Sequence, residues 1–445
     1  MSLAYEVGKV VSRRSFVAGA AGAAFKSLIG LKIAEARNTD IDIAIVGAGA
    51  AGIAAGKTIE KSGRTFVVLE ARNRVGGRAH TDYSALDSPF DCGAHWLHFA
   101  HENRLAEMAR RQGYQLTSSS REATRLIDAG RVTSSSTHRR FEEAIEQLEI
   151  AGSQWLKTGR DTAIADLAAE DPNLARALVV AAIEMAEEPA RLSLKDYASL
   201  GKGRDLTVKG GLGAYIATLA CGLPIQLNAP VRSISWGGSG VEISGGFGKI
   251  VAKKCIITVP TAVLASGDVH FNPHLPQPIA QALNDLPLGV MNKVGIRLLD
   301  PIDIDAEYVL DVDDISTGRW QVMHLSEEHR IATFLIVGDH ARRLSADGPQ
   351  VMEAFAVERL RGLFGNKVRF DRTLSTAWDR DPYAKGAYSY ARVGSAQSRS
   401  IYTQPIAEKL FFAGEASVGP QAVTVGGAYE SGMKAAQAAL AAIGK

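Results

Sequence analysis

The chain has 445 residues, more than one ordinary hydrophobic core accommodates, so two domains are the default expectation. Apolar residues make up 46% and charged residues 22%, the balance of a globular protein rather than of a disordered or fibrous one. The formal net charge is only +2 and basic residues form no long runs, so we expect no nucleic-acid partner. Cys92, Cys221 and Cys255 form no CxxC pair, so we expect no metal site and interpret all three as buried apolar residues.

The first segment, residues 1–36, has the pattern of an export signal. Arg13 and Arg14 precede a short apolar run over 17–25, and residues 34–36 have the A-x-A form that signal peptidase cleaves. An uncleaved anchor helix or an amphipathic leader is the alternative, but the run is shorter than the roughly 20 residues that span a bilayer. The sequence therefore predicts a twin-arginine signal, the Tat export machinery as a partner, and a periplasmic or secreted location.

A glycine-rich turn follows the first predicted strand, which covers 42–46. Gly47, Gly49 and Gly52, with Ala51 before the last, form a G-x-G-x-x-G pattern. In such a turn the first glycine permits the bend, the second lets the backbone approach a pyrophosphate, and the third lets the following helix pack closely. Because a helix start also offers free N–H groups to phosphate oxygens, the pattern predicts a dinucleotide site.

An acidic residue closes this unit. A helix predicted over 53–61 is followed by a second strand over 65–69, which ends at Glu70. A carboxylate at this place accepts hydrogen bonds from ribose hydroxyls and repels a 2′-phosphate, so NADP is disfavoured. Strand, glycine turn, helix, strand and acid occur together here, which makes the pattern more specific than a glycine turn alone.

The stretch after Glu70 favours FAD over NAD. Ala71 and Arg72 lead into Gly76, Gly77 and Arg78, so that two glycines lie between arginines beside the predicted phosphate site. The stretch resembles the second phosphate-binding segment of the flavin-containing amine oxidases, in which the glycines pass beneath the pyrophosphate and the arginines neutralise it. The resemblance implies FAD as the cofactor, and a solvated charged loop is the alternative.

Other segments resemble the same family, in the same order, over about residues 41–443. The segment 91–98 resembles the one that runs past the flavin ring, and 230–234 resembles the strand whose backbone contacts adenine. The strand predicted over 251–260 ends in Thr-Val-Pro, and an alanine-rich helix follows the last motif. The resemblance implies further contacts to the cofactor from Gly93, Ala94, His95, Trp96, Val231, Pro260, Gly414, Glu415, Thr424 and Val425.

The fold that this family implies is of the α/β class, a Rossmann-like FAD-binding domain interleaved with an α+β substrate-binding domain. We expect residues 40–120, 205–290 and 375–445 to form the FAD-binding domain. Residues 121–204 and 291–374 are then expected to form the substrate-binding domain. The active site is expected at the junction of the two domains.

Flavin oxidation of an amine needs an oriented amine in a dry slot, since the cofactor itself takes the hydride equivalent. Lys293 matches the family lysine that reaches the flavin N5 through a water molecule. A strand residue pointing to solvent is the alternative.

Tyr388 and Trp378 resemble an aromatic wall of the substrate slot, which would favour a neutral amine. Two core aromatics at a domain boundary are the alternative here.

Four positions bear on which amine the protein would oxidise: His95, Glu184, Arg319 and Thr424. Thr424 stands where the monoamine oxidases have a second tyrosine, and the pattern around His95 is closer to the vertebrate-type polyamine oxidases, which implies that His95 lies near the amine. Glu184 resembles a tunnel glutamate of the plant-type polyamine oxidases and would meet a distant ammonium group. The exposed end of a helix is the alternative. The segment beside the flavin lacks the arginine that would grip an amino-acid carboxylate, although Arg319 from another strand stays open.

The predicted activity is FAD-dependent oxidation of a polyamine or secondary amine to an imine, which hydrolyses to an aldehyde and an amine. O₂ is the expected acceptor and H₂O₂ the expected product. Oxidation of monoamines, of L-amino acids in the manner of a tryptophan monooxygenase, or of alkaloid-like amines stays open. A demethylase acting on protein lysines is a further alternative, but the helical docking insertions that it needs are not visible. A homodimer also stays open.

Overall fold

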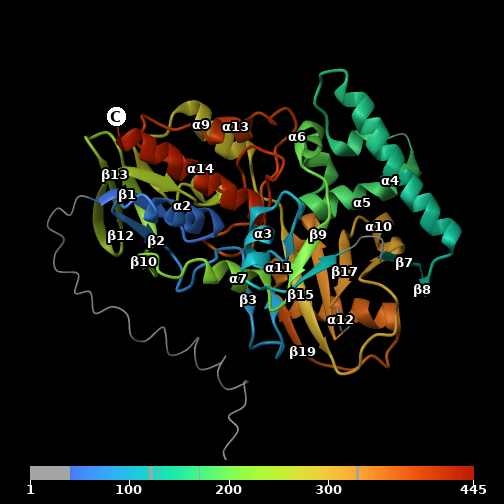
Figure 1. The fold of residues 1–445 in the computed structure, drawn as a ribbon. Coiled ribbons are helices and arrows are strands. Elements are labelled where there is room, and N and C mark those ends of the chain that lie inside the picture. The colour runs from blue at the N-terminus through green and yellow to red at the C-terminus, as the bar shows by residue number, and fades with distance from the viewer. Residues whose placement is uncertain (1–40, 120–123, 129, 170, 327–329, 445) are drawn as a thin grey trace, which may run out of the picture. The chain divides into compact units, whose positions relative to one another are not determined.

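The computed structural model describes residues 41–444, apart from 120–123, 129, 170 and 327–329 (Figure 1). The described residues belong to one compact unit. The predicted export signal lies outside them. In this described part of the chain, none of the helices is long and apolar enough to cross a membrane.

The first large sheet contains the strand that precedes the glycine turn. β1 (Ile41–Val46) pairs in parallel with β2 (Phe66–Leu69) on one side and with β13 (Gly248–Ile257) on the other. Over the described residues the strand order is β10-β2-β1-β13-β12-β11-β14, with β20 paired to β13. The remaining strands are β10 (Ile225–Gln226), β11 (Val231–Ser235), β12 (Val241–Gly245), β14 (His270–Asn272) and β20 (Leu410–Phe412).

Two helices from opposite ends of the chain pack on this sheet. α2 (Ala50–Glu60) and α14 (Val425–Ile443) lie side by side in Figure 1, and their buried faces share one hydrophobic cluster with β1. Gly432 of α14 lies so close to α2 that a Cβ at this position would be 2.0 Å from the carbonyl oxygen of Ala51. This close contact places the start of α14 beside the glycine turn.

The second large sheet contains the strand of Lys293. Its order over the described residues is β19-β15-β18-β17-β16-β7-β8, and it is antiparallel except for the pair of β16 and β7. Its strands are β7 (Thr124–Asp128), β8 (Arg131–Val132), β15 (Met291–Leu298), β16 (Tyr308–Asp311), β17 (Gln321–Leu325), β18 (Ile331–Val337) and β19 (Phe370–Ser375).

Helices cover both faces of this second sheet, because alternate residues of a strand point to opposite faces. On β18, Phe334 and Ile336 pack with α11 (Gly338–Asp347) and α12 (Pro349–Phe364), whereas Leu335 and Val337 pack with α4 (Ser135–Leu156) and α5 (Pro172–Met185). The strand is therefore buried along its whole length.

Shorter elements connect the two sheets. A small sheet of β5, β9 and β6 and a pair of β3 and β4 bring the segment 81–97 beside the strand of Lys293. The strands are β3 (Thr81–Asp82), β4 (Phe90–Asp91), β5 (Trp96–Leu97), β6 (Leu116–Ser119) and β9 (Asp205–Val208). The helices are α3 (Arg104–Arg111), η2 (Ile164–Ala168), η3 (Pro189–Arg191), α6 (Leu194–Ser199), α7 (Leu212–Thr218), α8 (Thr261–Ala265), α9 (Gln277–Asp285), α10 (Val312–Ser316) and α13 (Ser398–Tyr402).

The predicted domain boundaries stay a prediction, because the described residues belong to one compact unit. Strands of the second large sheet come from the segments predicted for the substrate-binding domain, except that β19 continues to Ser375. One smaller expectation was wrong. Cys92 and Cys255 are buried, but Cys221 is exposed, because it follows the short helix α7 in a surface turn.

Candidate active site

One cavity of about 1450 Å³ is lined by residues of both large sheets. Its volume exceeds the roughly 300–1,000 Å³ of ordinary small-molecule sites, so it has room for a dinucleotide and a second molecule. Gly52 is the one predicted site residue that does not line it. The cavity is lined by Gly47, Gly49, Ala51, Glu70, Ala71, Arg72, Gly76, Gly77, Arg78, Gly93, Ala94, His95, Trp96, Glu184, Val231, Pro260, Lys293, Trp378, Tyr388, Gly414, Glu415, Thr424 and Val425.

The two predicted phosphate-binding loops lie against each other. Gly76 N–H donates to the carbonyl oxygen of Ala48 at 2.8 Å, and a Cβ on Gly77 would lie 3.3 Å from the Cα of Gly49. Gly52, behind the turn, has no space for a side chain, since a Cβ there would be 1.9 Å from the carbonyl oxygen of Gly47. Gly52 therefore permits the close packing of the helix start against the turn. Gly47, Gly49, Gly76 and Gly77 instead line the cavity with exposed backbone.

The side chain of Glu70 forms hydrogen bonds to the backbone of both loops. Its carboxylate is buried and accepts backbone N–H groups from Ala48 and Arg72, each at 2.8 Å. The guanidinium of Arg72 in turn pairs with Asp381 at 2.5 Å. Because a carboxylate has about four acceptor positions, Glu70 still has capacity for a ribose hydroxyl in the role predicted for it.

Glu415 joins the C-terminal motif to the second loop. Its carboxylate accepts from Arg78 at 3.0 Å and from the backbone N–H and hydroxyl of Ser389 at 3.1 and 2.8 Å. Arg78 also donates to the carbonyl oxygen of Ala387 at 2.7 Å. These contacts hold the chain on either side of Tyr388 against the predicted cofactor site.

Lys293 is buried in β15, with 4% of its surface exposed, so the alternative of a solvent-facing strand residue does not hold. Its Nζ donates to the carbonyl oxygen of Asp91 at 3.0 Å and lies 5.5 Å from the centre of the Trp96 ring. Burial lowers the pKa of Lys293 to about 8, and the negative charge of Asp91 opposes part of that change. The cavity therefore contains an amine group that changes charge close to neutral pH.

His95 lies beside Lys293 within a cluster of rings. Its Nδ1 lies 2.8 Å from the Asp91 carboxylate, and its ring packs edge-on against Trp96 and His324, with centroids 4.8 and 5.2 Å apart. Burial lowers the pKa of His324 to about 4, although Glu307 opposes that change, so His324 is neutral at neutral pH. The position predicted to be near an amine thus packs against the rings of Trp96 and His324 and contacts the Asp91 carboxylate.

The two predicted wall aromatics are held by hydrogen bonds to the backbone. Trp378 donates its indole N–H to the carbonyl oxygen of Cys92 at 2.8 Å, and Tyr388 donates its hydroxyl to the carbonyl oxygen of Ile183 at 3.2 Å. Burial raises the pKa of Tyr388, so its phenol stays protonated. Both residues line the cavity, and Trp378 also belongs to a buried hydrophobic cluster with Leu86 and Phe90. Their place in an aromatic wall stays a prediction.

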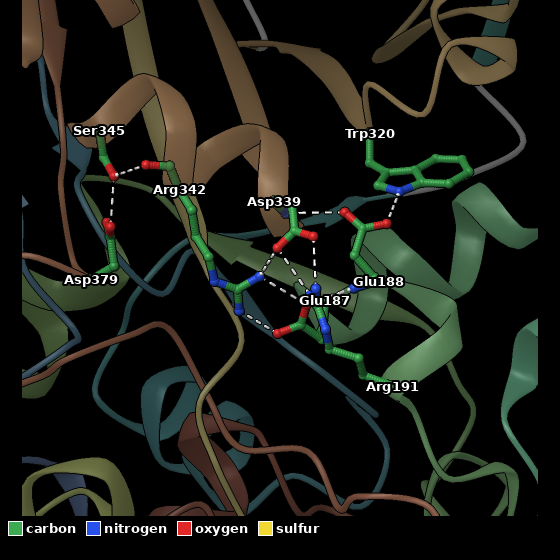
Figure 2. Close-up of polar contacts among 8 residues, drawn as sticks. All are labelled: Glu187, Glu188, Arg191, Trp320, Asp339, Arg342, Ser345 and Asp379. Atoms are coloured by element: carbon green, nitrogen blue, oxygen red, sulfur yellow. Dashed lines mark hydrogen bonds and ion pairs between the residues drawn. The ribbon is translucent and has the colours of Figure 1, made fainter. Parts of the chain in front are cut away.

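Asn292, the neighbour of Lys293, anchors the loop of Trp378. Its side-chain oxygen accepts the Trp378 backbone N–H at 2.8 Å, and its amide donates to Asp379 at 2.8 Å. Asp379 also accepts from Ser345 at 2.6 Å, as Figure 2 shows. A buried polar chain therefore runs from α11 to the strand of Lys293.

Charged side chains fix the segment that follows α5 (Figure 2). Glu187 is fully buried, and its carboxylate pairs with Arg191 at 2.7 Å and also with Arg342. Asp339 pairs with each of these arginines at 2.7 Å. The cluster holds the end of the helix that carries Glu184, which is half-buried and accepts from Tyr197 at 2.5 Å. Glu184 therefore faces the cavity rather than forming an exposed helix end.

Thr424 caps a helix as well as lining the cavity. Its hydroxyl donates to the carbonyl oxygen of Gln421 at 2.7 Å and accepts the N–H of Gly427 at 3.0 Å. Its hydroxyl proton is therefore used within the turn that starts α14, which leaves one acceptor position of the oxygen.

Several residues of the site carried no role in the sequence analysis. Asp91 stands within the quoted motif, four residues before His95, and this spacing was the available signal. His324, Tyr197 and Asp379 belong to none of the motifs described above, so no sequence pattern pointed to them. Among the described residues, no group of three or more His, Cys, Asp or Glu side chains is arranged to hold a metal ion.

A Rossmann-type turn, a second glycine loop against it and a buried lysine in the same cavity define a flavin-binding oxidoreductase of the α/β class. A family model described as flavin containing amine oxidoreductase matches residues 50–149 and 156–440. The chain belongs to this family. It is therefore an oxidoreductase that acts on amines with FAD as its cofactor, which confirms the predicted family, fold class and cofactor.

Individual relatives agree with this assignment. Polyamine oxidase 4 of Oryza sativa subsp. japonica is 28% identical over 428 residues, covering 88% of this chain and 87% of the relative. Cyclohexylamine oxidase from Brevibacterium oxydans IH-35A shares the fold with a TM-score of 0.72 at 22% identity, covering 92% of this chain and 100% of that structure. A double mutant of putrescine oxidase redesigned in cofactor binding gives a TM-score of 0.76 at 20% identity, covering 90% and 99%.

Proposed function

We propose that this amine oxidase acts on a polyamine or a related secondary amine. In the proposed reaction the C–N bond becomes an imine, water hydrolyses the imine to an aldehyde and an amine, and O₂ is reduced to H₂O₂. The observation that carries the proposal is that the Glu184 carboxylate lines the same cavity as Lys293. A carboxylate elsewhere in the same cavity would attract an ammonium group remote from the reacting nitrogen.

The residues around the glycine turn fit FAD. The backbone at Gly49 and Gly76 and the N-terminus of α2 are open to the cavity and would hold the pyrophosphate, and Glu70 would hold the ribose. The start of α14 would face negative charge on the flavin, since a helix N-terminus is electropositive. Bound FAD would supply the acceptor for the hydride equivalent removed from the amine.

The chain's own side chains would orient the substrate and exclude water. Tyr388 and Trp378 present aromatic surface that favours a neutral amine, and both rings are fixed by hydrogen bonds. Lys293, with its pKa lowered to about 8, would hold a water molecule through Nζ and exchange a proton with it. No other acid or base is required of the protein in this scheme.

The arginines around the cavity argue against an amino acid as substrate. Among the described residues, those that line it are Arg72, Arg78 and Arg232. Arg72 and Arg78 belong to the second glycine loop, and Arg232 lies on β11 beside the proposed adenine site. Arg319 is not among the lining residues and lies 4.0 Å from Asp314. The described lining therefore contains no further arginine for gripping a substrate carboxylate.

Steady-state kinetics of Glu184→Gln tests the proposal. We expect KM for spermidine to rise at least about tenfold, the equivalent of one lost charge contact, while KM for benzylamine changes little. Glu242→Gln, which alters an exposed carboxylate on β12, is the matched control and should leave both values unchanged. An equal effect of Glu184→Gln on both substrates would contradict the assignment of Glu184 to a distant ammonium group.

We also propose export of the folded holoprotein by the Tat machinery to the periplasm or the medium. The support is the twin-arginine pattern, because a chain that binds FAD has to fold where FAD is made. Replacing Arg13 and Arg14 together by lysine should leave the active protein in the cytoplasm, as measured by fractionation. Sedimentation of the purified holoprotein would decide whether it forms the homodimer that the sequence leaves open.

A further inference from the structure

Asp91 is a buried carboxylate that the proposed reaction does not use. Its side chain accepts the hydroxyl of Thr81 at 2.6 Å and the backbone N–H groups of Leu212 and Gly213 at 3.0 and 3.1 Å. The fourth contact is the one to His95 Nδ1 at 2.8 Å. With 5% of its surface exposed, Asp91 has its acceptor positions filled by the protein rather than by water.

The carboxylate is held in its charged form. Burial alone would raise the pKa of Asp91, but the hydrogen bonds from His95 and Thr81 and the charge of Lys293 lower it below the ordinary value. The same residue also contacts Lys293, whose Nζ donates to the Asp91 carbonyl oxygen at 3.0 Å. Asp91 thus contacts His95 through its carboxylate and Lys293 through its backbone carbonyl oxygen.

An ionised carboxylate only accepts hydrogen bonds, so the nitrogen of His95 that faces Asp91 carries the proton. In a neutral imidazole the other nitrogen, Nε2, then has a free lone pair. Rotation of the ring would break the contact to Asp91 and is hindered by the packed rings of Trp96 and His324, 4.8 and 5.2 Å away. Since His95 lines the cavity, Nε2 is the nitrogen left for a ligand.

We propose that Asp91 is a positioning residue that fixes the Nδ1–H tautomer of His95, so that Nε2 accepts a hydrogen bond from an N–H group of the bound amine. This inference rests on the proposed place of the substrate beside His95. It assigns to Asp91 a role distinct from packing, because Oδ2 of the carboxylate accepts from both His95 Nδ1 and the Leu212 N–H, whereas a neutral amide of the same size can turn a donor toward Nδ1. In Asp91→Asn the amide can donate to Nδ1, which leaves Nε2 protonated and facing the cavity as a donor.

The tautomer can be measured directly in the holoenzyme without substrate. Two-bond ¹⁵N–¹H correlation spectra of histidine-labelled protein, with the His95 signals assigned from His95→Gln, identify which nitrogen carries the proton. We expect Nδ1–H alone in the wild type, and a population of Nε2–H in Asp91→Asn as the fixed acceptor is lost. Finding Nε2–H in the wild type would overturn the proposal, whether or not Asp91→Asn folds.

Kinetics separates positioning from a structural role. Asp91→Asn should raise KM for any amine that the enzyme oxidises by about tenfold or more, with a smaller change in kcat. Thr81→Val is the matched control, because it removes hydrogen bonds of the same cluster but leaves the contact between Asp91 and His95. Equal effects of the two variants on KM would contradict the proposal. Failure of polyamines alone as substrates would affect the proposed function and leave this test intact.

Discussion

The Nζ of Lys293 lies 5.5 Å from the centre of the Trp96 ring, and the lysine is buried on a strand whose residues are nearly all buried. The contact to the aromatic face and the hydrogen bond to the Asp91 carbonyl oxygen compensate only part of the cost of burying a cation. The folded protein therefore holds this amine closer to its neutral form than water does.

The stability of the protein should consequently depend on pH through Lys293. Burial lowers its pKa to about 8 in the folded protein, while the unfolded chain keeps the ordinary value of 10.5. The unfolded state binds more protons between these two values, so the penalty from Lys293 is complete below about pH 8 and disappears as the pH rises to 10.5. The difference corresponds to about 3 kcal/mol.

Urea unfolding of the flavin-free protein measures this penalty. We expect Lys293→Met to be more stable than the wild type at pH 7, and the advantage to stay level up to about pH 8 and then to shrink toward pH 10.5. Lys434→Met, at an exposed position of α14, should change stability little at either pH. A constant difference between Lys293→Met and the wild type over this range would show that the lysine is not desolvated in the folded state.

Gly52→Ala should prevent FAD from binding. The added Cβ would lie 1.9 Å from the carbonyl oxygen of Gly47, so the turn that faces the pyrophosphate has to move. Gly362→Ala is a matched helical control, since nothing lies within 4 Å of its Cβ position, and it should retain FAD and gain about 0.5–1 kcal/mol. The ratio of flavin to protein absorbance checks both, and a fully yellow Gly52→Ala protein would refute the role of Gly52.

Arg399→Met should destabilise the protein by about 3–5 kcal/mol, because it leaves the buried charge of Asp196 without its partner. The two side chains are 3% and 2% exposed, with the closest atoms 2.6 Å apart. Arg369→Met breaks an exposed pair with Asp300 and should cost less than about 1 kcal/mol. Thermal or chemical unfolding of both variants checks this contrast, and equal losses would contradict it.

The sequence predicted those parts of the site that depend on local patterns. The turn from Gly47 to Gly52 and the second loop at Gly76 each lie within a few consecutive residues, and the structure brings the two loops together as the resemblance implies. Lys293 could be chosen because it matches the lysine of the family motif, and a lysine in an apolar strand needs a specific reason to be there.

Contacts between distant segments could not be predicted in this way. Asp91 receives N–H groups from Leu212 and Gly213, which are 121 and 122 residues away in the chain. His324 stands in an ordinary apolar strand, and only the fold brings its ring against His95. The exposure of Cys221 was missed because a single apolar residue in a surface turn has no pattern that distinguishes it from a core residue.

Anaerobic titration of the purified holoprotein with amines, followed by admission of air, tests the central claim most directly. We predict that spermidine or another secondary amine bleaches the flavin absorbance, and that air restores it with release of one H₂O₂ per amine oxidised. The account would be contradicted if the flavin stayed oxidised with every polyamine and secondary amine but was bleached by L-amino acids.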